Sequence, residues 1–187
     1  MDNKDYTNII FKIFQEICKI PHPAEQEEAI GDYLMAFAKA HGLKVKKDNV
    51  VNILICKAAA KGCEKSPTVI LQAHQDMVCE KDAALIHDFM KQPIQTYIED
   101  GWLKAKGTTL GADDGIGMAM MLAVLADSTL KHGPIEALFT VSEETGLDGA
   151  MALKPDFITG KVLLNLDSED EGEIFVGCAG GLDTTAE

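Results

Sequence analysis

Apolar side chains recur with helical spacing over the first forty residues of the chain. One stripe predicts an amphipathic helix over residues 5–19, and the two prolines of IPHPA (residues 20–24) end it. A second stripe predicts a helix over residues 25–40, which His41 and Gly42 close. The residues of the two stripes are Ile10, Ile13, Phe14 and Ile17, then Ile30, Tyr33, Leu34 and Phe37.

After Gly42 the pattern changes to short apolar or alternating runs, which predict strands. These runs are KVKKD, VVNILIC, TVILQAH, WLKA, IEALFTV, KVLLNLD and EIFVGCA. The run IGMAMMLAVLA is long enough for a buried helix, a short helix is expected around Leu147 to Leu153, and residues 80–100 fit neither pattern clearly. Strands interleaved with helices predict an α/β fold with a mixed sheet flanked by helices on both faces.

The size of the chain fits one medium domain. It has 187 residues, of which 47% are hydrophobic, so it can bury a real core. The sequence ends on the glycine-rich segment GCAGGLDTTAE, directly after a predicted strand and without a closing helix. This pattern is typical of a domain boundary or of an interruption within a domain.

The charge balance and the cysteines narrow the class of protein. Thirty acidic residues face 17 basic ones, all of them lysine, and the net charge of -13 argues against nucleic-acid binding. Five scattered cysteines without a CxxC pair predict free thiols rather than disulfides or a structural zinc knot. With a polar start, MDNKDYTN, and no run of 18 apolar residues, we expect a cytoplasmic protein without a membrane partner.

Four groups of residues are candidates for catalysis or metal binding. Three of them directly follow predicted strands, and the fourth lies in the loop before the buried helix. They are His74 and Asp76 in LQAHQDMV, Asp113 and Asp114 in GADDG, Glu143 and Glu144 in SEETG, and Asp167 in LLNLDSE. Ligands of open α/β sheets bind at the carboxyl ends of the strands. Carboxylates crowded at that edge would repel one another unless cations held them together. The pattern therefore predicts a divalent metal site, with zinc favoured because an imidazole takes part.

Each member of this set also has an ordinary structural interpretation. A single histidine after a strand is more often structural, although the i, i+2 spacing of His74 and Asp76 places both side chains on one face of an extended chain. GADDG could be a helix N-terminus capped by an aspartate, and SEETG could be a solvated turn. The segment DSEDEGE resembles the start of a calcium loop, with Asp167, Glu169, Glu171 and Gly172 at positions 1, 3, 5 and 6. No carboxylate stands at its position 12 and no helix pair flanks it, so calcium binding is disfavoured.

Taken together, four segments resemble the zinc dipeptidase family of metallopeptidases, which includes the aminoacyl-histidine (Xaa-His) dipeptidases. They are AHQDMV, GTTLGADDGIGMA, FTVSEETGLDGA and NLDSEDEGEIFVGCAGG, and IPHPAEQEEAI near the N-terminus is similar to the family's entry into its second helix. The resemblance runs essentially from end to end of the chain. It implies a zinc-peptidase-like catalytic domain that hydrolyses small peptides.

The resemblance also implies roles for individual residues. His74 and Asp167 would be ligands of the first zinc, Asp113 would bridge both zinc ions, and Glu144 would be a ligand of the second. Asp76 would hold the imidazole of His74 in place, and Glu143 would be the general base that takes a proton from the attacking water. Asp114 has no role in the family pattern, so we expect it to cap the helix or to support a ligand.

The chain departs from the family pattern in its length. Family members are about twice as long or longer, with a lid and dimerisation domain followed by a second catalytic segment that supplies a final histidine. Residues 1–187 are therefore expected to be the N-terminal segment of the catalytic domain, with a complete ligand set for the first zinc only. Cobalt or manganese is an alternative metal, and a homodimer is expected only with the lid.

Three functions remain open at this stage. The first is hydrolysis of Xaa-His dipeptides, weak or absent in this segment alone. The second is a broader di- or tripeptidase or a deacylase of the same superfamily, since specificity depends largely on residues outside this sequence. The third is a non-catalytic metal-binding segment.

Overall fold

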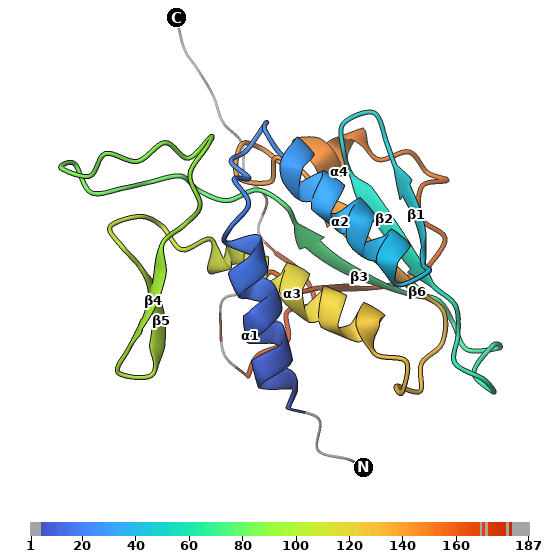
Figure 1. Ribbon diagram of the computed structural model, residues 1–187. Coiled ribbons are helices and arrows are strands. Elements are labelled where there is room, and N and C mark those ends of the chain that lie inside the picture. Colours follow the sequence, from blue (N-terminus) through green and yellow to red (C-terminus); the bar gives the residue numbers. More distant parts are fainter. Residues whose placement is uncertain (1–4, 169, 171, 179, 181–187) are drawn as a thin grey trace, which may run out of the picture.

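The computed structural model describes residues 5–168, 170, 172–178 and 180. Its helices are α1 (Tyr6–Ile17), α2 (Glu28–Ala40), α3 (Ala112–Ala126) and α4 (Asp148–Ala152). Its strands are β1 (Lys44–Lys47), β2 (Ile53–Lys57), β3 (Val69–His74), β4 (Thr96–Glu99), β5 (Trp102–Ala105), β6 (Ile135–Thr140) and β7 (Val162–Asn165). Figure 1 shows α1, α2 and α3 on one side of the main sheet, and the β4–β5 hairpin projecting beyond it.

The main sheet has five strands in the order β1-β2-β6-β3-β7. The pairs β1–β2 and β2–β6 are antiparallel, whereas β3 is parallel to both β6 and β7. In this register His74, the last residue of β3, lies beside Thr140, the last residue of β6. The loops that follow β3, β6 and β7 therefore leave the sheet at the same edge. The mixed α/β architecture predicted from the sequence is confirmed.

The two faces of the sheet are covered differently. On one face, side chains of β2, β3 and β6 pack with those of α1, α2 and α3 to form the main core, which includes Phe14, Ile30, Ile53, Met118 and Phe139. On the other face, a smaller cluster joins the buried Leu54, Ile70 and Leu138 to partly buried residues that include Leu153, Phe157 and Ile158. Because successive strand residues point to opposite faces, Ile53 and Leu54 serve different layers.

The packing of α1 against α3 depends on a glycine. A Cβ atom at Gly115 would lie 2.8 Å from Cε2 of Phe14, whose side chain is 1% exposed. Glycine at this position therefore lets the two helices approach closely. This contact fixes the start of α3, which carries two of the candidate site residues.

Two expectations from the sequence need correction. The run EIFVGCA forms no strand within its described residues 173–178, where Ile174 and Val176 are almost fully exposed. Strand propensity alone does not order a segment that has no neighbouring strand and no face to bury. The second helix begins at Glu28 instead of residue 25, because Glu25 adopts a left-handed conformation with a φ of 64°.

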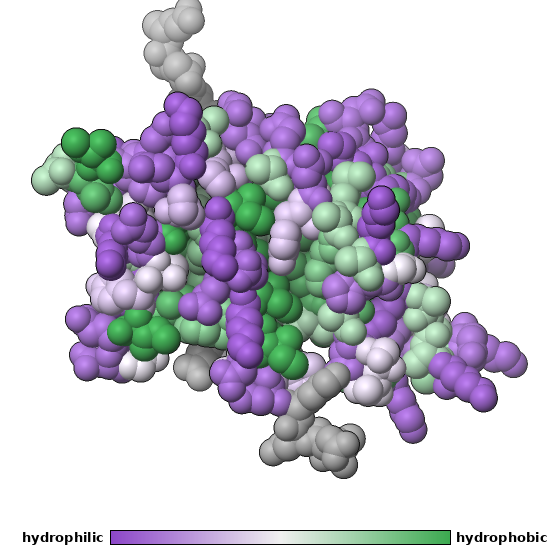
Figure 2. All heavy atoms as spheres, in the orientation of Figure 1, coloured by the Kyte–Doolittle hydropathy of each residue, from purple (hydrophilic) through white to green (hydrophobic). Residues whose placement is uncertain are grey.

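The remaining expectations concern residues 80–100, the end of the chain and membrane spans. Within residues 80–100, which were ambiguous in the sequence, β4 pairs with β5 alone as a separate two-stranded sheet. Glu169, Glu171 and the final residues 181–187 lie outside the described part of the chain. In that described part no helix is both long enough and apolar enough to cross a membrane. The face drawn in Figure 2 is mostly hydrophilic, with separate hydrophobic areas.

Candidate metal centre and active site

The candidate residues come together at the carboxyl edge of the parallel strands. His74 ends β3, Asp76 follows it, and Glu143 and Glu144 follow β6. Asp167 follows β7, and the first turn of α3 carries Asp113 and Asp114. Helix α3 follows the β4–β5 hairpin and precedes β6, and the hydrogen bond from the N–H of His74 to Asp114 places its N-terminus at the same edge as the end of β3.

His74 lies at the centre of the site and is 1% exposed. Its Nε2 atom lies 2.9 Å from Oδ1 of Asp113 and 3.9 Å from Oδ2 of Asp167. On the other side of the ring, Nδ1 is 3.3 Å from Oδ1 of Asp76 but lacks hydrogen-bond geometry. One ring nitrogen thus faces a buried carboxylate, while the other faces two carboxylates that are more exposed.

Asp76 connects the histidine to the two glutamates. Its carboxylate is buried, and its two oxygens accept hydrogen bonds from the backbone N–H groups of Glu143 (3.0 Å) and Glu144 (3.1 Å). Burial raises the pKa of Asp76, but the adjacent imidazole of His74 and the hydrogen bonds from the two backbone amides outweigh burial and hold the pKa below its ordinary value. Asp76 therefore stays ionised and fixes the turn that presents both glutamates.

Asp113 and Asp114 have different environments although they are adjacent. The side chain of Asp113 is 64% exposed, whereas Asp114 is buried. Asp114 accepts hydrogen bonds from the backbone N–H groups of His74 (3.2 Å) and Gly117 (3.1 Å). The bond to Gly117 is that of a helix N-cap, so Asp114 both starts the regular part of α3 and ties it to the end of β3. The peptide bond between the two aspartates is cis.

Two groups of side chains are close enough to hold a metal ion. The first comprises His74, Asp113 and Glu144, and the second comprises His74, Asp114 and Asp167; within each group the ligand atoms lie within 4.8 Å of one another. Glu143 belongs to neither of these groups among the described residues. Burial and the nearby charge of Asp113 raise the pKa of Glu144.

The pKa values show what the crowding of carboxylates does in the absence of a cation. Burial lowers the pKa of His74, but the adjacent Asp76 and Asp113 outweigh burial and raise it to about 10. Burial and the charge of Asp167 raise the pKa of Asp114 to about 8, and burial also raises the pKa of Asp167 to about 6. Protons would therefore compete with a divalent cation for these side chains.

The structure adds three polar residues that the sequence did not reveal. Glu27 and Asn52 are buried, and each accepts hydrogen bonds from the segment that leads to the two glutamates. Ser142, which directly precedes Glu143, is buried with a φ of 49°. Nothing in the pattern around Glu27 separates it from the exposed Glu25 and Glu28, since only the tertiary structure makes its environment distinct.

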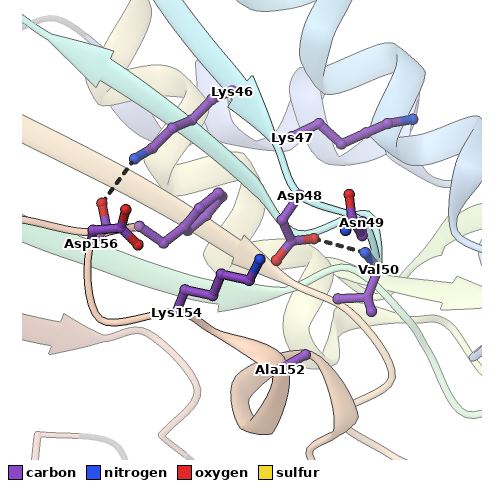
Figure 3. A pocket seen from close by; sticks show the side chains of 9 residues that line it. Lys46, Lys47, Asp48, Asn49, Val50, Ala152, Lys154 and Asp156 are labelled. Atoms are coloured by element: carbon purple, nitrogen blue, oxygen red, sulfur yellow. Dashed lines mark hydrogen bonds between the residues drawn. The ribbon is translucent and has the colours of Figure 1, made fainter.

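A separate groove of about 320 Å³ lies between the end of β1 and the residues that follow α4. Lysines and aspartates line it, and Figure 3 shows Lys46 extending toward the backbone of Asp156 while Asp48 accepts a hydrogen bond from the N–H of Val50. None of the candidate site residues lines this groove. The chemistry of the chain is therefore concentrated at the sheet edge and not in this groove.

Comparison with known proteins finds similarity to peptidases. The chain is 52% identical over 177 residues to the cytosol non-specific dipeptidase of Escherichia coli K12, an alignment that covers 95% of this chain and 36% of that protein. Its fold is similar to that of aminoacylhistidine dipeptidase from Vibrio alginolyticus, with a TM-score of 0.88 and 47% identity over 94% of this chain and 37% of the other. A tripeptidase from Staphylococcus aureus matches with a TM-score of 0.74 and 26% identity over 87% of this chain and 44% of the other. This chain therefore spans less than half of the length of each of these relatives.

A protein-family model assigns the chain to a family. Residues 70–178, more than half of the chain, match the model of peptidase family M20/M25/M40. This range contains His74, the two aspartates at the start of α3, both glutamates and Asp167. The side chains that gather at this sheet edge thus lie within the matched range, and the chain belongs to peptidase family M20/M25/M40.

Proposed function

We propose that the protein carrying this sequence hydrolyses dipeptides at a site that holds two zinc ions. The observation that carries the proposal is the group of His74, Asp113 and Glu144, whose potential ligand atoms converge at the edge where the family's residues are expected. Dipeptidases of E. coli and V. alginolyticus are similar to this chain along almost its whole length. For the substrate we favour Xaa-His dipeptides, because the resemblance in the sequence motifs points to that class.

The donor set suits zinc. Imidazole nitrogen and carboxylate oxygen are both ordinary zinc ligands, and a second carboxylate that faces the other ring nitrogen orients the imidazole. Here Nδ1 of His74 is buried without a hydrogen-bond partner and faces Asp76, which leaves Nε2 directed at Asp113 and Asp167. We assign His74, Asp113 and Asp167 to the first zinc, and Asp113 and Glu144 to the second. Cobalt and manganese would suit the same ligands.

The roles of the remaining residues follow from their contacts. Bound zinc ions would supply a water of lowered pKa and a polarised peptide carbonyl. Glu143 takes the proton of the attacking water and passes it to the departing amine, a task that requires a carboxylate free of metal. Its absence from both ion-holding groups of the described residues supports this assignment. Asp76 keeps Glu143 in position through the backbone N–H of that residue.

The complete site requires more than these residues. His74 is the only histidine of the five in the chain that belongs to an ion-holding group of the described residues. We propose that the second zinc takes a further histidine from outside residues 1–187, and that a lid and dimerisation domain also lies outside them. We also propose a cytoplasmic location, which the name of the E. coli relative supports.

A broader peptidase is the second candidate. The E. coli relative is named a non-specific dipeptidase, and the S. aureus structure is that of a tripeptidase. The residues at the sheet edge serve peptide hydrolysis in general and do not select a side chain. A panel of Xaa-His dipeptides, other dipeptides and tripeptides would separate the two candidates by their relative kcat/KM.

Metal binding by the 187-residue chain tests the centre directly. We expect tight binding of one zinc ion after dialysis, and loss of that zinc in His74→Ala. His41→Ala is the matched control, because His41 is exposed and stands at the C-terminal end of α2, outside the candidate site residues. Zinc retention in His74→Ala would refute the assignment of this residue. Hydrolysis is then measured on the protein that carries the whole sequence, where chelator-resistant turnover would refute a metal-dependent reaction.

A further inference from the structure

The segment that carries the two glutamates is held by its backbone to an unusual degree. Four successive N–H groups, those of residues 141 to 144, each donate to a side chain from elsewhere in the chain. Asn52 accepts from Val141, Glu27 accepts from Ser142, and Asp76 accepts from the last two. Three acceptors that are far apart in the sequence thus fix one turn.

Glu27 has the least expected of these positions. It stands at the N-cap of α2, where a short polar side chain normally caps the helix, yet its side chain makes no capping hydrogen bond. Instead Oε1 of Glu27 accepts from the backbone N–H of Ser142 at 2.8 Å and from its hydroxyl at 2.9 Å. The same oxygen accepts from the N–H of Glu25 at 3.1 Å. The side chain is thus committed to the turn and not to its own helix.

The turn needs such support because its backbone conformation is costly. Ser142 has a φ of 49° and Glu25 has a φ of 64°, both in the left-handed region that residues with a Cβ atom seldom adopt. The N–H of Glu25 also donates to the hydroxyl of Ser142 at 3.2 Å. One buried carboxylate oxygen therefore joins two unfavourable backbone positions on different segments.

We propose that Glu27 is a positioning residue for the Glu143–Glu144 turn. It acts through Ser142, whose conformation sets the direction in which the chain leaves β6 and so the place of the carboxylate that follows. This inference rests on the proposed role of Glu143 as the general base. The hydrogen bonds of the Glu27 carboxylate come from Ser142 and Glu25, neither of which is a proposed metal ligand.

These hydrogen bonds determine which side chains can replace Glu27. All three use Oε1, so a side chain of the same length with one acceptor oxygen can replace the carboxylate. Glu27→Gln keeps the reach and one oxygen but loses the charge, whereas Glu27→Asp keeps the charge but is shorter. A positioning role requires Gln to behave like the native residue and Asp to behave like Ala.

The first test is amide hydrogen exchange on the 187-residue chain. We expect the Ser142 amide to exchange about tenfold faster or more in Glu27→Ala and Glu27→Asp, and at the native rate in Glu27→Gln. Amides of β6 such as that of Leu138 should not change, and Glu28→Ala is the matched control because Glu28 is exposed. Unchanged exchange of Ser142 in both Ala and Asp would overturn the proposal. Should Ala fail to fold, the contrast between Asp and Gln still decides.

The second test uses dipeptide hydrolysis by the protein that carries this sequence. Glu27→Ala and Glu27→Asp should lower kcat about 100-fold, with KM close to the native value, and Glu27→Gln should keep the native kcat. A loss in Gln as large as that in Ala would overturn the positioning role in favour of a charge effect. If the native protein hydrolyses no peptide, the proposed function fails, while the exchange measurement still decides whether Glu27 holds the turn.

Discussion

Replacement of Asp76 by asparagine should weaken metal binding although it leaves the proposed ligands intact. The carboxylate is buried, faces Nδ1 of His74 at 3.3 Å, and accepts the N–H groups of Glu143 and Glu144. Asparagine has nearly the same shape but only one acceptor oxygen. Its NH2 group must face either the N–H of Glu144, or both the N–H of Glu143 and the imidazole of His74.

The magnitude follows from these contacts. In Asp76→Asn one backbone N–H loses its charge-assisted hydrogen bond and instead faces the NH2 group of asparagine. This change should cost about 1.5–3 kcal/mol of folding free energy. Loss of the carboxylate behind a metal-ligating histidine typically weakens metal affinity about 10–100-fold. The lowered pKa of Asp76 means that its contribution to stability is present above its ordinary pKa of 3.8 and is lost as the pH falls further. At neutral pH the native residue therefore contributes fully.

Two assays separate these effects. Competition with a chromophoric chelator at pH 7 measures the affinity for zinc, and urea denaturation in EDTA measures the stability of the metal-free chain. Asp148→Asn is the matched control, since Asp148 is exposed and lies a few residues beyond the two glutamates. A zinc affinity of Asp76→Asn within about twofold of the native value would refute the reasoning about the orientation of His74.

Three further predictions test other parts of the site and the fold. Glu143→Ala should reduce kcat about 10²–10⁴-fold and retain the metal, whereas metal loss on dialysis would make this residue a ligand. The raised pKa of Asp114, about 8 against an ordinary value of 3.8, favours its protonated form in the folded chain. Its contribution to stability is therefore greatest below about pH 4 and is lost as the pH rises to 8. Between these pH values, urea denaturation in EDTA should show a smaller decrease in the free energy of unfolding for Asp114→Asn than for the native chain. An equal dependence on pH in the two proteins would contradict this. Gly115→Ala should lower the free energy of unfolding by about 1–3 kcal/mol because the new methyl group meets the ring of Phe14, and a gain in stability would show that the helices separate freely.

The sequence predicts those features that depend on local pattern or on the direction of strands. The stripe of Phe14 and Ile17 predicts α1, and the long apolar run after Asp114 predicts α3. His74 and Asp167 were expected at one edge because both follow strands, and the parallel register of β3 and β7 brings these strand ends level. Periodicity and topology carry this information without knowledge of the packing.

Other features depend on contacts that no local pattern encodes. The run EIFVGCA has the composition of a strand, but Ile174 and Val176 find no surface to cover within the described residues. Glu27 lies in a run of acidic residues, and only its distance to Ser142 distinguishes it from its exposed neighbours. For Asp114 the sequence predicts a helix cap, which agrees with its hydrogen bond from Gly117, whereas its bond from the N–H of His74 depends on the tertiary structure.

The unequal exposure of the candidate ligands has a consequence for how an ion enters and leaves the centre. His74 is 1% exposed while the side chain of Asp113 is 64% exposed, so the site is buried around the imidazole and accessible to solvent at Asp113. In the proposed metal centre a chelator would replace the exposed carboxylate ligands first, while the imidazole would still bind the ion. Metal exchange should therefore proceed on the folded chain, at a rate that increases with chelator concentration and does not wait for unfolding.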